Sequence, residues 1–294
     1  MLTPELSRRA FIAAGGAVAL VACSGGDSSK TKKQSSTSGK GAGKGSGKGG
    51  LQALRVSSDL YATEIPQRFA FIFTLDGEFV SEGDATLAVR SQGGTFGDDL
   101  PATLRTEGLP KGRGIYTLDL VLEKDGIWEG RATVKGKPVK LFFQVSKTPL
   151  GPIPGSAAPM APSPTPAVTL GVDPICTRVP ACPLHTKSLE TLIGKGRPVV
   201  VMFATPARCQ TQFCGPVLDQ LLSVQGEYSS QVDFVHVEIY ESTEGTNLVS
   251  TVSAWGFDSE PWLFTISPDG TVQERLDGAF ATDEIRSVLD RLIA

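Results

Sequence analysis

The alternation of apolar and polar residues gives the two halves of the chain different patterns. Between about residues 51 and 147, apolar side chains recur at every second position, as in Phe69, Phe71 and Phe73. A period of two is typical of a β-strand with one buried face, and Asp125-Gly126 adds a hairpin turn. About six or seven short strands fit into this stretch, which predicts an antiparallel β-sandwich.

Beyond about residue 171 the pattern changes to strands alternating with helices. Residues 198–204 form a continuous apolar run typical of a buried strand, and residues 216–228 have the spacing of an amphipathic helix. This alternation predicts a sheet with helices on both faces, an α/β arrangement. The other predicted elements are helices at 188–195, 247–255 and 282–293, a strand at 232–240, and a hairpin over 262–276.

Two segments of biased composition separate these regions. Residues 23–50 are mainly Gly, Ser and Lys and predict a flexible tether, whereas residues 148–170 are rich in Pro and predict a semi-rigid spacer. The sequence therefore predicts five segments: a signal peptide at 1–22, the tether at 23–50, a β-sandwich domain at 51–147, the Pro-rich linker at 148–170, and an α/β domain at 171–294.

The first residues read as export and processing signals. Arg8 and Arg9 precede an apolar run that ends at Ala22, which is short for a membrane span. The stretch around the two arginines resembles a twin-arginine export signal, and Leu20-Val21-Ala22-Cys23 resembles a lipobox. These resemblances imply a bacterial lipoprotein, with a lipid on Cys23 anchoring it to the outer face of the cell membrane.

Charge argues against nucleic acid as a partner. The formal net charge is −3, and the basic residues that cluster lie in the tether rather than along a predicted helix. The predicted partners are the membrane, through the lipid, and other proteins.

The predicted β-domain carries a weak resemblance of its own. Gly114-Ile115-Tyr116 and Gly126-Ile127-Trp128 resemble strands of small extracytoplasmic immunoglobulin-like domains, some of which handle copper. Copper favours soft or imidazole ligands, and this segment has no His, Cys or Met. We therefore interpret this domain as a structural or partner-binding module.

The C-terminal half resembles the thioredoxin-like superfamily at two places. Val199 to Cys209 resembles the strand that leads into the redox cysteine, and Trp255-Gly256-Phe257 followed by Glu260 to Phe264 resembles the second signature of the family. The resemblance implies a thioredoxin-like α/β fold over about residues 184–294. It also implies that Pro261 follows a cis peptide and that Pro261 and Trp262 shape a substrate groove.

The same resemblance makes Cys209 and Cys214 the candidate catalytic cysteines. It implies thiol–disulfide exchange with protein thiols and disulfides, although four residues separate the pair where the family has two. Either cysteine can be the nucleophile. A redox-silent scaffold with a permanent Cys209–Cys214 bridge is the alternative. Peroxiredoxin-like peroxidase activity, suggested by Thr211, and a Sco-type copper site are further alternatives whose motif spacing does not match.

Cys176 and Cys182 lie close together just before the α/β pattern begins. In an oxidising compartment such neighbours predict a structural disulfide, with a disulfide shuttle as the alternative. A zinc site of four cysteines has unfavourable spacing. We interpret His236 as a packed strand residue, and His185 has no partner identifiable from sequence. The sequence thus predicts neither a metal nor a cofactor.

Overall fold

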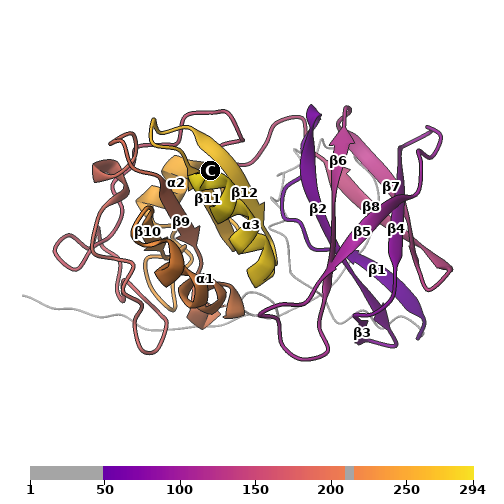
Figure 1. Ribbon diagram of the computed structural model, residues 1–294, viewed down its shortest axis with the longest axis horizontal. Helices are drawn as coiled ribbons and strands as arrows, with labels where there is room; N and C mark the ends of the chain where they lie inside the picture. The colour runs from indigo at the N-terminus through magenta and orange to yellow at the C-terminus, as the bar shows by residue number, and fades with distance from the viewer. Residues whose placement is uncertain (1–48, 209–214) are drawn as a thin grey trace, which may run out of the picture. The chain divides into compact units, whose positions relative to one another are not determined.

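The computed structural model describes residues 49–208 and 215–294. The predicted lipidation site Cys23 and the predicted redox pair Cys209 and Cys214 lie outside the described residues, as does the predicted signal segment. Figure 1 shows the described elements, which form two β-sheets. Within the described ranges, the structure has no helix that is long and apolar enough to cross a membrane.

The first sheet is antiparallel and follows the period of two seen in the sequence. Phe69, Phe71 and Phe73 are fully buried on one face of β2, and the rings of Phe71 and Phe73 pack against Tyr116 of β6. This sheet consists of β1 (Leu51–Arg55), β2 (Thr63–Leu75), β3 (Glu78–Val80), β4 (Ala85–Ser91), β5 (Leu100–Arg105), β6 (Ile115–Leu122), β7 (Gly126–Val134) and β8 (Lys137–Val145).

The pairing of these strands is compatible with the predicted β-sandwich and shows how its two parts are connected. They form one path, β1-β2-β6-β5-β4-β7-β8, with β3 paired to β2. Strand β5 joins the two parts because it pairs with both β4 and β6. The end strands β1 and β8 also lie close together, so the sheet nearly closes on itself. Alternation specifies the buried face of each strand but not which strands are hydrogen-bonded.

The second sheet has four strands in the order β10-β9-β11-β12. Strand β9 pairs in parallel with β10 and antiparallel with β11, so it is central, and all five of its residues are buried. Burial on both faces explains the uninterrupted apolar run in the sequence. The strands are β9 (Val199–Phe203), β10 (Asp233–Val237), β11 (Trp262–Ile266) and β12 (Val272–Asp277).

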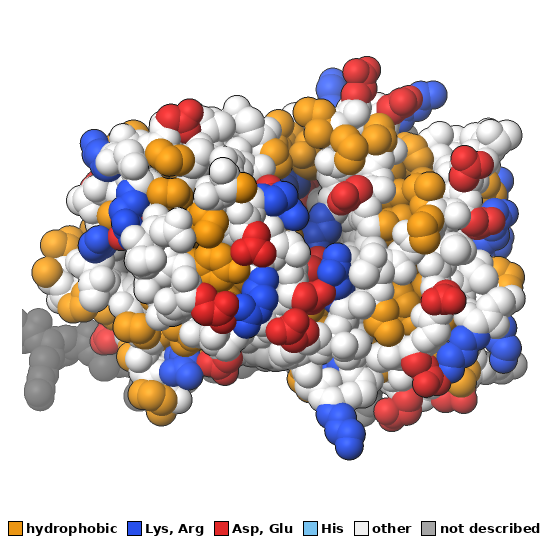
Figure 2. Space-filling view, in the orientation of Figure 1, with side chains coloured by type: hydrophobic (Ala, Val, Ile, Leu, Met, Phe, Trp, Pro, Cys, Tyr) orange, Lys and Arg blue, Asp and Glu red, His pale blue; other side chains and the backbone are white. Residues whose placement is uncertain are grey.

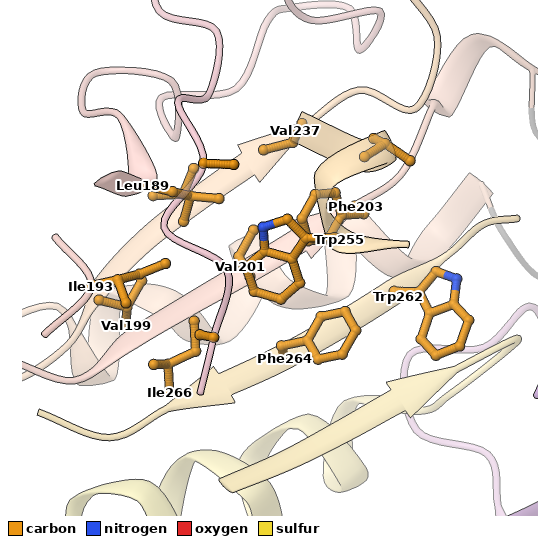
Figure 3. Packing of buried hydrophobic residues seen from close by; sticks show 14 of the residues in the cluster. Leu189, Ile193, Val199, Val201, Phe203, Val237, Trp255, Trp262, Phe264 and Ile266 are labelled. Atoms are coloured by element: carbon orange, nitrogen blue, oxygen red, sulfur yellow. The ribbon is translucent and has the colours of Figure 1, made fainter. Parts of the chain in front are cut away.

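Each face of this sheet packs against its own hydrophobic cluster. On one face, shown in Figure 3, the aromatic rings of Phe203, Trp255 and Phe264 pack together, and Trp255 comes from helix α2 (Ser250–Trp255). The other face is covered by helices α1 (Gly215–Tyr228) and α3 (Thr282–Ile293), which contribute Leu221 and Val288.

The α/β thioredoxin-like fold class predicted from the sequence is wrong for this chain. Among the described residues, strands predominate and α-helices are few. The predicted helix at 188–195 is only a short 3-10 turn, η1 (Leu189–Thr191), and the one at 247–255 shortens to α2. Gly194 and Gly196, both with positive φ, end the first of these after a single turn because such a backbone cannot continue a helix.

The Pro-rich segment packs against the second sheet rather than forming an exposed spacer. The backbone amide of Gly155 donates to Val272 O, and that of Ala158 donates to Gly270 O, at the β11–β12 hairpin. Ser163 is buried, and its hydroxyl accepts a hydrogen bond from the amide of Leu189. These backbone contacts are not visible in composition, which is why the sequence suggested a spacer.

Charged side chains of both signs are interspersed on the face that Figure 2 shows. Salt bridges pair charged side chains of opposite sign among the described residues, such as Arg90 with Glu129 and Arg131 with Asp99. This face therefore carries no continuous basic patch.

Candidate metal centre

Two cysteines and two histidines converge beside the second sheet. Their potential ligand atoms, one from each of Cys176, Cys182, His185 and His236, all lie within 4.8 Å of one another. The four residues are between 0% and 8% exposed. Three of them come from the irregular segment that precedes η1, and the fourth comes from strand β10.

Strand β10 fixes the orientation of His236. Alternation along the strand places Val235 and Val237 in the cluster of Figure 3, whereas His236 points to the opposite face, toward the two cysteines. Its Nε2 lies 2.9 Å from the carbonyl oxygen of Ala204, and a carbonyl can only accept. Nε2 therefore carries the proton, and the lone pair of Nδ1 faces the cluster, which is the tautomer that a metal-binding imidazole needs.

The cysteine-containing segment is held against β10 by backbone contacts. The amide of His236 donates to Leu184 O at 3.0 Å, which brings His185 alongside the strand. The amide of Cys182 donates to Sγ of Cys176 at 3.3 Å, which turns both thiols inward. Both cysteines are free thiols.

The distances from His236 to the other three residues are close to those of a tetrahedral zinc site. His236 Nδ1 lies 3.0 Å from His185 Nε2, 3.4 Å from Cys182 Sγ and 3.9 Å from Cys176 Sγ. With Zn–S bonds of about 2.3 Å and Zn–N bonds of about 2.0 Å, neighbouring ligand atoms of a tetrahedron are about 3.3 to 3.8 Å apart. Each of these three distances is within about 0.4 Å of the corresponding edge, and all four atoms lie within 4.8 Å of one another, so small side-chain rotations can bring them to one shared ion.

The hydrogen bonding of His185 is incomplete among the described residues. This side chain is 4% exposed, its Nε2 faces His236, and its Nδ1 has no partner. A buried polar atom without a partner costs about 1–3 kcal/mol. If Nε2 of His185 binds a cation, the energy of that bond can offset the cost of the unpaired Nδ1.

The protonation states of the cluster suit a cation. Burial lowers the pKa of His236 below its ordinary value, which keeps the ring neutral. The hydrogen bond between the thiols lowers the pKa of Cys176 and raises that of Cys182, so the pair favours at least one thiolate. Neutral imidazole and thiolate are the forms that bind transition metals.

A second layer of hydrogen bonds supports the cysteine-containing segment. The amide of Thr177 donates to Glu238 Oε1 at 2.6 Å, and the hydroxyl of Thr177 also contacts that carboxyl. The same hydroxyl accepts a hydrogen bond from the amide of Ala207 in η2 (Pro206–Arg208) at 3.0 Å. Burial raises the pKa of Glu238 to about 8. These contacts fix the residue next to Cys176 and thereby the direction of its thiol.

The structure changes the roles predicted for several residues. Cys176 and Cys182 do not form the predicted disulfide here, and they face His236 instead. The Glu260–Pro261 peptide is cis, as the sequence suggested. However, Pro261 is buried and Trp262 is 0% exposed within the aromatic cluster, so neither side chain forms the surface of a groove.

Sequence reasoning missed the histidines because each was considered alone. The available signal was the spacing Cys176-x5-Cys182-x2-His185, in which two soft ligands and an imidazole fall within ten residues. The fourth ligand lies about 50 residues later, and only the pairing of Leu184 with β10 brings it near.

Glu260, which precedes Pro261, gives a pH-dependent prediction. Its carboxylate accepts a hydrogen bond from the amide of Thr205, and burial raises its pKa from 4.5 to about 7. A raised carboxyl pKa means that stability is full below about pH 4.5 and declines as pH rises through about 7. The loss should be on the order of 1–2 kcal/mol, less than the full shift implies because the side chain is partly exposed.

Replacing Glu260 with Gln tests this assignment. Glu260→Gln keeps an acceptor for Thr205 but cannot ionise, so its urea midpoint should stay constant between pH 5 and 8 apart from background titration. The exposed Glu244→Gln serves as the control and should follow the wild-type pH profile. Equal slopes for wild type and Glu260→Gln would contradict the assignment.

Comparison with known proteins gives little further guidance. No family model matches the chain, and no curated protein matches it. A CARDB domain of a Pyrococcus furiosus protein, solved in complex with di-metal ions, is among the structural matches. It shares 16% identity, the match covers 34% of this chain and 89% of that domain, and the TM-score is 0.22. A match this weak carries no argument about the fold or the function of this chain.

Proposed function

We propose that this chain is a metalloprotein whose C-terminal half binds one Zn²⁺ ion through Cys176, Cys182, His185 and His236. The observation that carries the proposal is the convergence of the four buried ligand atoms within 4.8 Å. Two sulfur and two imidazole donors in a tetrahedral arrangement favour zinc among the common metals.

The role we propose for the ion is structural. All four ligands are buried, and together they complete a tetrahedral shell, whereas a catalytic zinc keeps one position open for water or substrate. Three of the ligands lie in a segment without helix or strand, between the Pro-rich segment and η1. The ion would fasten this segment to β10.

We further propose that the protein acts outside the cytoplasmic membrane. The arginine pair and the lipobox-like sequence ending at Cys23 support export and lipid anchoring. Metabolic labelling with palmitate in a bacterial host tests the anchor. The substitution Cys23→Ser should abolish incorporation of the labelled lipid into the protein. Labelling that persists in this variant would contradict the assignment of Cys23.

Metal analysis of the purified full-length chain tests the zinc site. Inductively coupled plasma mass spectrometry should find about one zinc per chain, falling below about a tenth of that in Cys182→Ser and in His236→Gln, because removing one ligand of a closed site leaves too few donors. Cys209→Ser with Cys214→Ser is the matched control, since it removes two cysteines outside the cluster. Zinc that is retained in Cys182→Ser but lost in the control would place the ion elsewhere.

Thiol–disulfide exchange by Cys209 and Cys214 stays a prediction, since both residues lie outside the described part of the chain. Insulin or glutathione disulfide exchange should fall in Cys209→Ser or Cys214→Ser if that pair is catalytic. An unchanged rate in both variants would favour the alternative of a redox-silent scaffold.

A further inference from the structure

We propose that Cys176 and Cys182 make the metal site switchable by oxidation: a disulfide between them and a bound zinc ion exclude one another. This inference rests on the zinc site proposed above. In it, the same two thiols either bind zinc or form a disulfide, so their oxidation state controls zinc binding at that site.

The two sulfurs are placed for either state. Both residues are free cysteines, and Cys176 Sγ lies 3.3 Å from the backbone nitrogen of Cys182 and within 4.8 Å of its sulfur. A disulfide needs the sulfurs about 2.05 Å apart and the Cα atoms within about 6.8 Å. Because Cys176 Sγ already touches the backbone of Cys182, rotation of the side chains within an irregular segment can close the remaining distance.

The loop between the two cysteines lies at the surface. Cys176 and Cys182 are 8% and 7% exposed, whereas His236 is fully buried behind them on β10. Between the cysteines the chain turns outward, and Val179 is 93% exposed. Movement of this exposed loop can therefore give an oxidant access to the buried thiols without opening the sheet.

The chemistry balances with a disulfide as the oxidant. The zinc-bound thiolates of Cys176 and Cys182 together give two electrons to an external disulfide R–S–S–R, and their sulfurs join. The two R–S⁻ groups that leave take up two protons, and Zn²⁺ departs. A disulfide sulfur has no thiolate charge, so only two imidazoles remain, which is too few for a closed zinc site. Oxidation thus expels the ion, and a bound ion protects the thiols.

The loop between the cysteines connects this switch to neighbouring elements. Thr177 accepts the hydrogen bond from Ala207 of η2, and Arg178 Nε donates to Asp219 of α1 at 2.7 Å. Both residues lie between Cys176 and Cys182, so they move with the loop when the two sulfurs change partners. Whether Cys176 and Cys182 bind zinc or form a disulfide therefore affects the contacts that position η2 and α1.

The test uses the full-length chain with Cys23, Cys209 and Cys214 all replaced by Ser, which leaves only the two thiols in question. The zinc-loaded protein is titrated with oxidised glutathione, while released zinc is followed with a chromogenic chelator and the disulfide by peptide mass mapping. We expect one zinc ion to be released for each Cys176–Cys182 disulfide that forms. The oxidised chain should be about 2 Da lighter than the reduced, metal-free chain, and reduction followed by addition of zinc should restore zinc binding. The metal-free form should oxidise on the order of tenfold faster or more, because a bound zinc ion occupies the thiolate lone pairs that would otherwise attack the disulfide.

The outcomes separate this inference from the proposal beneath it. If the chain takes up no zinc before oxidation, the zinc site itself fails. If zinc binds but stays bound after the disulfide has formed, or if oxidation is equally fast with and without zinc, the site stands and the switch is refuted. Zinc release with only mixed glutathione disulfides on the two cysteines would also refute it.

Discussion

Removing the metal with a chelator is expected to lower the free energy of unfolding by about 4 kcal/mol. This value applies when the reference sample contains free zinc at about a thousand times its dissociation constant. The reason is that the ion binds the folded arrangement of four ligands and not the unfolded chain. Without it, the segment that carries Cys176, Cys182 and His185 loses the link that these side chains make to His236 of β10 and keeps only individual contacts such as that of Leu184. Urea denaturation followed by circular dichroism, with and without chelator, measures the difference.

The control for this experiment is the chain that lacks a ligand. Cys182→Ser should unfold near the midpoint of the metal-free wild type, and the chelator should leave its midpoint unchanged. The doubly substituted Cys209→Ser, Cys214→Ser chain should respond to the chelator as the wild type does. A wild-type midpoint that does not move when zinc has been removed would show that the ion does not stabilise the fold.

Truncation of Trp262 is expected to cost about 3–5 kcal/mol of stability, because the residue is a core side chain. Its ring is fully buried, stacks on Phe257 at 5.1 Å and on Phe264 at 5.7 Å between centroids, and its Nε1 donates to Ser259 Oγ at 3.2 Å. Trp262→Ala removes these contacts and leaves a cavity beside β11. Thermal and urea denaturation of the purified variant measure the effect.

Trp262→Phe is the matched variant, since it keeps an aromatic ring in the same stack and should cost much less than the truncation. Both variants should still bind about one zinc while folded, because Trp262 belongs to the cluster on the opposite face of the sheet from His236. Wild-type stability of Trp262→Ala would show that Trp262 does not stabilise the core. It would favour the role in a substrate groove that the sequence predicted.

The sequence predicted the elements better than it predicted their arrangement. The period of two around Phe69, Phe71 and Phe73 correctly indicated strands, because burial of one face imposes that period. The same pattern cannot distinguish a sandwich from one nearly closed sheet, since that depends on which strands pair, as β5 does with both β4 and β6. The helices predicted after residue 188 were overestimated because Gly194 and Gly196 interrupt the first of them.

The candidate site was harder to predict than the strands. Two nearby cysteines favour a disulfide if the protein is exported, as the sequence predicts, and a lone His in an apolar strand favours packing. What these considerations omit is a tertiary fact: Leu184 pairs with His236, and the carbonyl of Ala204 fixes the tautomer of its ring. Neither contact has a signature in the sequence, because the partners are separated by tens of residues.

X-ray absorption at the zinc edge distinguishes the proposed ligand set from any other, because it counts the sulfur and nitrogen atoms bound to the ion. The full-length chain with Cys209 and Cys214 replaced by Ser should give two sulfur neighbours at about 2.3 Å and two nitrogen neighbours at about 2.0 Å, with imidazole scattering beyond them. A shell of oxygen and nitrogen alone, or a zinc site that disappears with Cys209 and Cys214, would contradict the account of a centre built by Cys176, Cys182, His185 and His236.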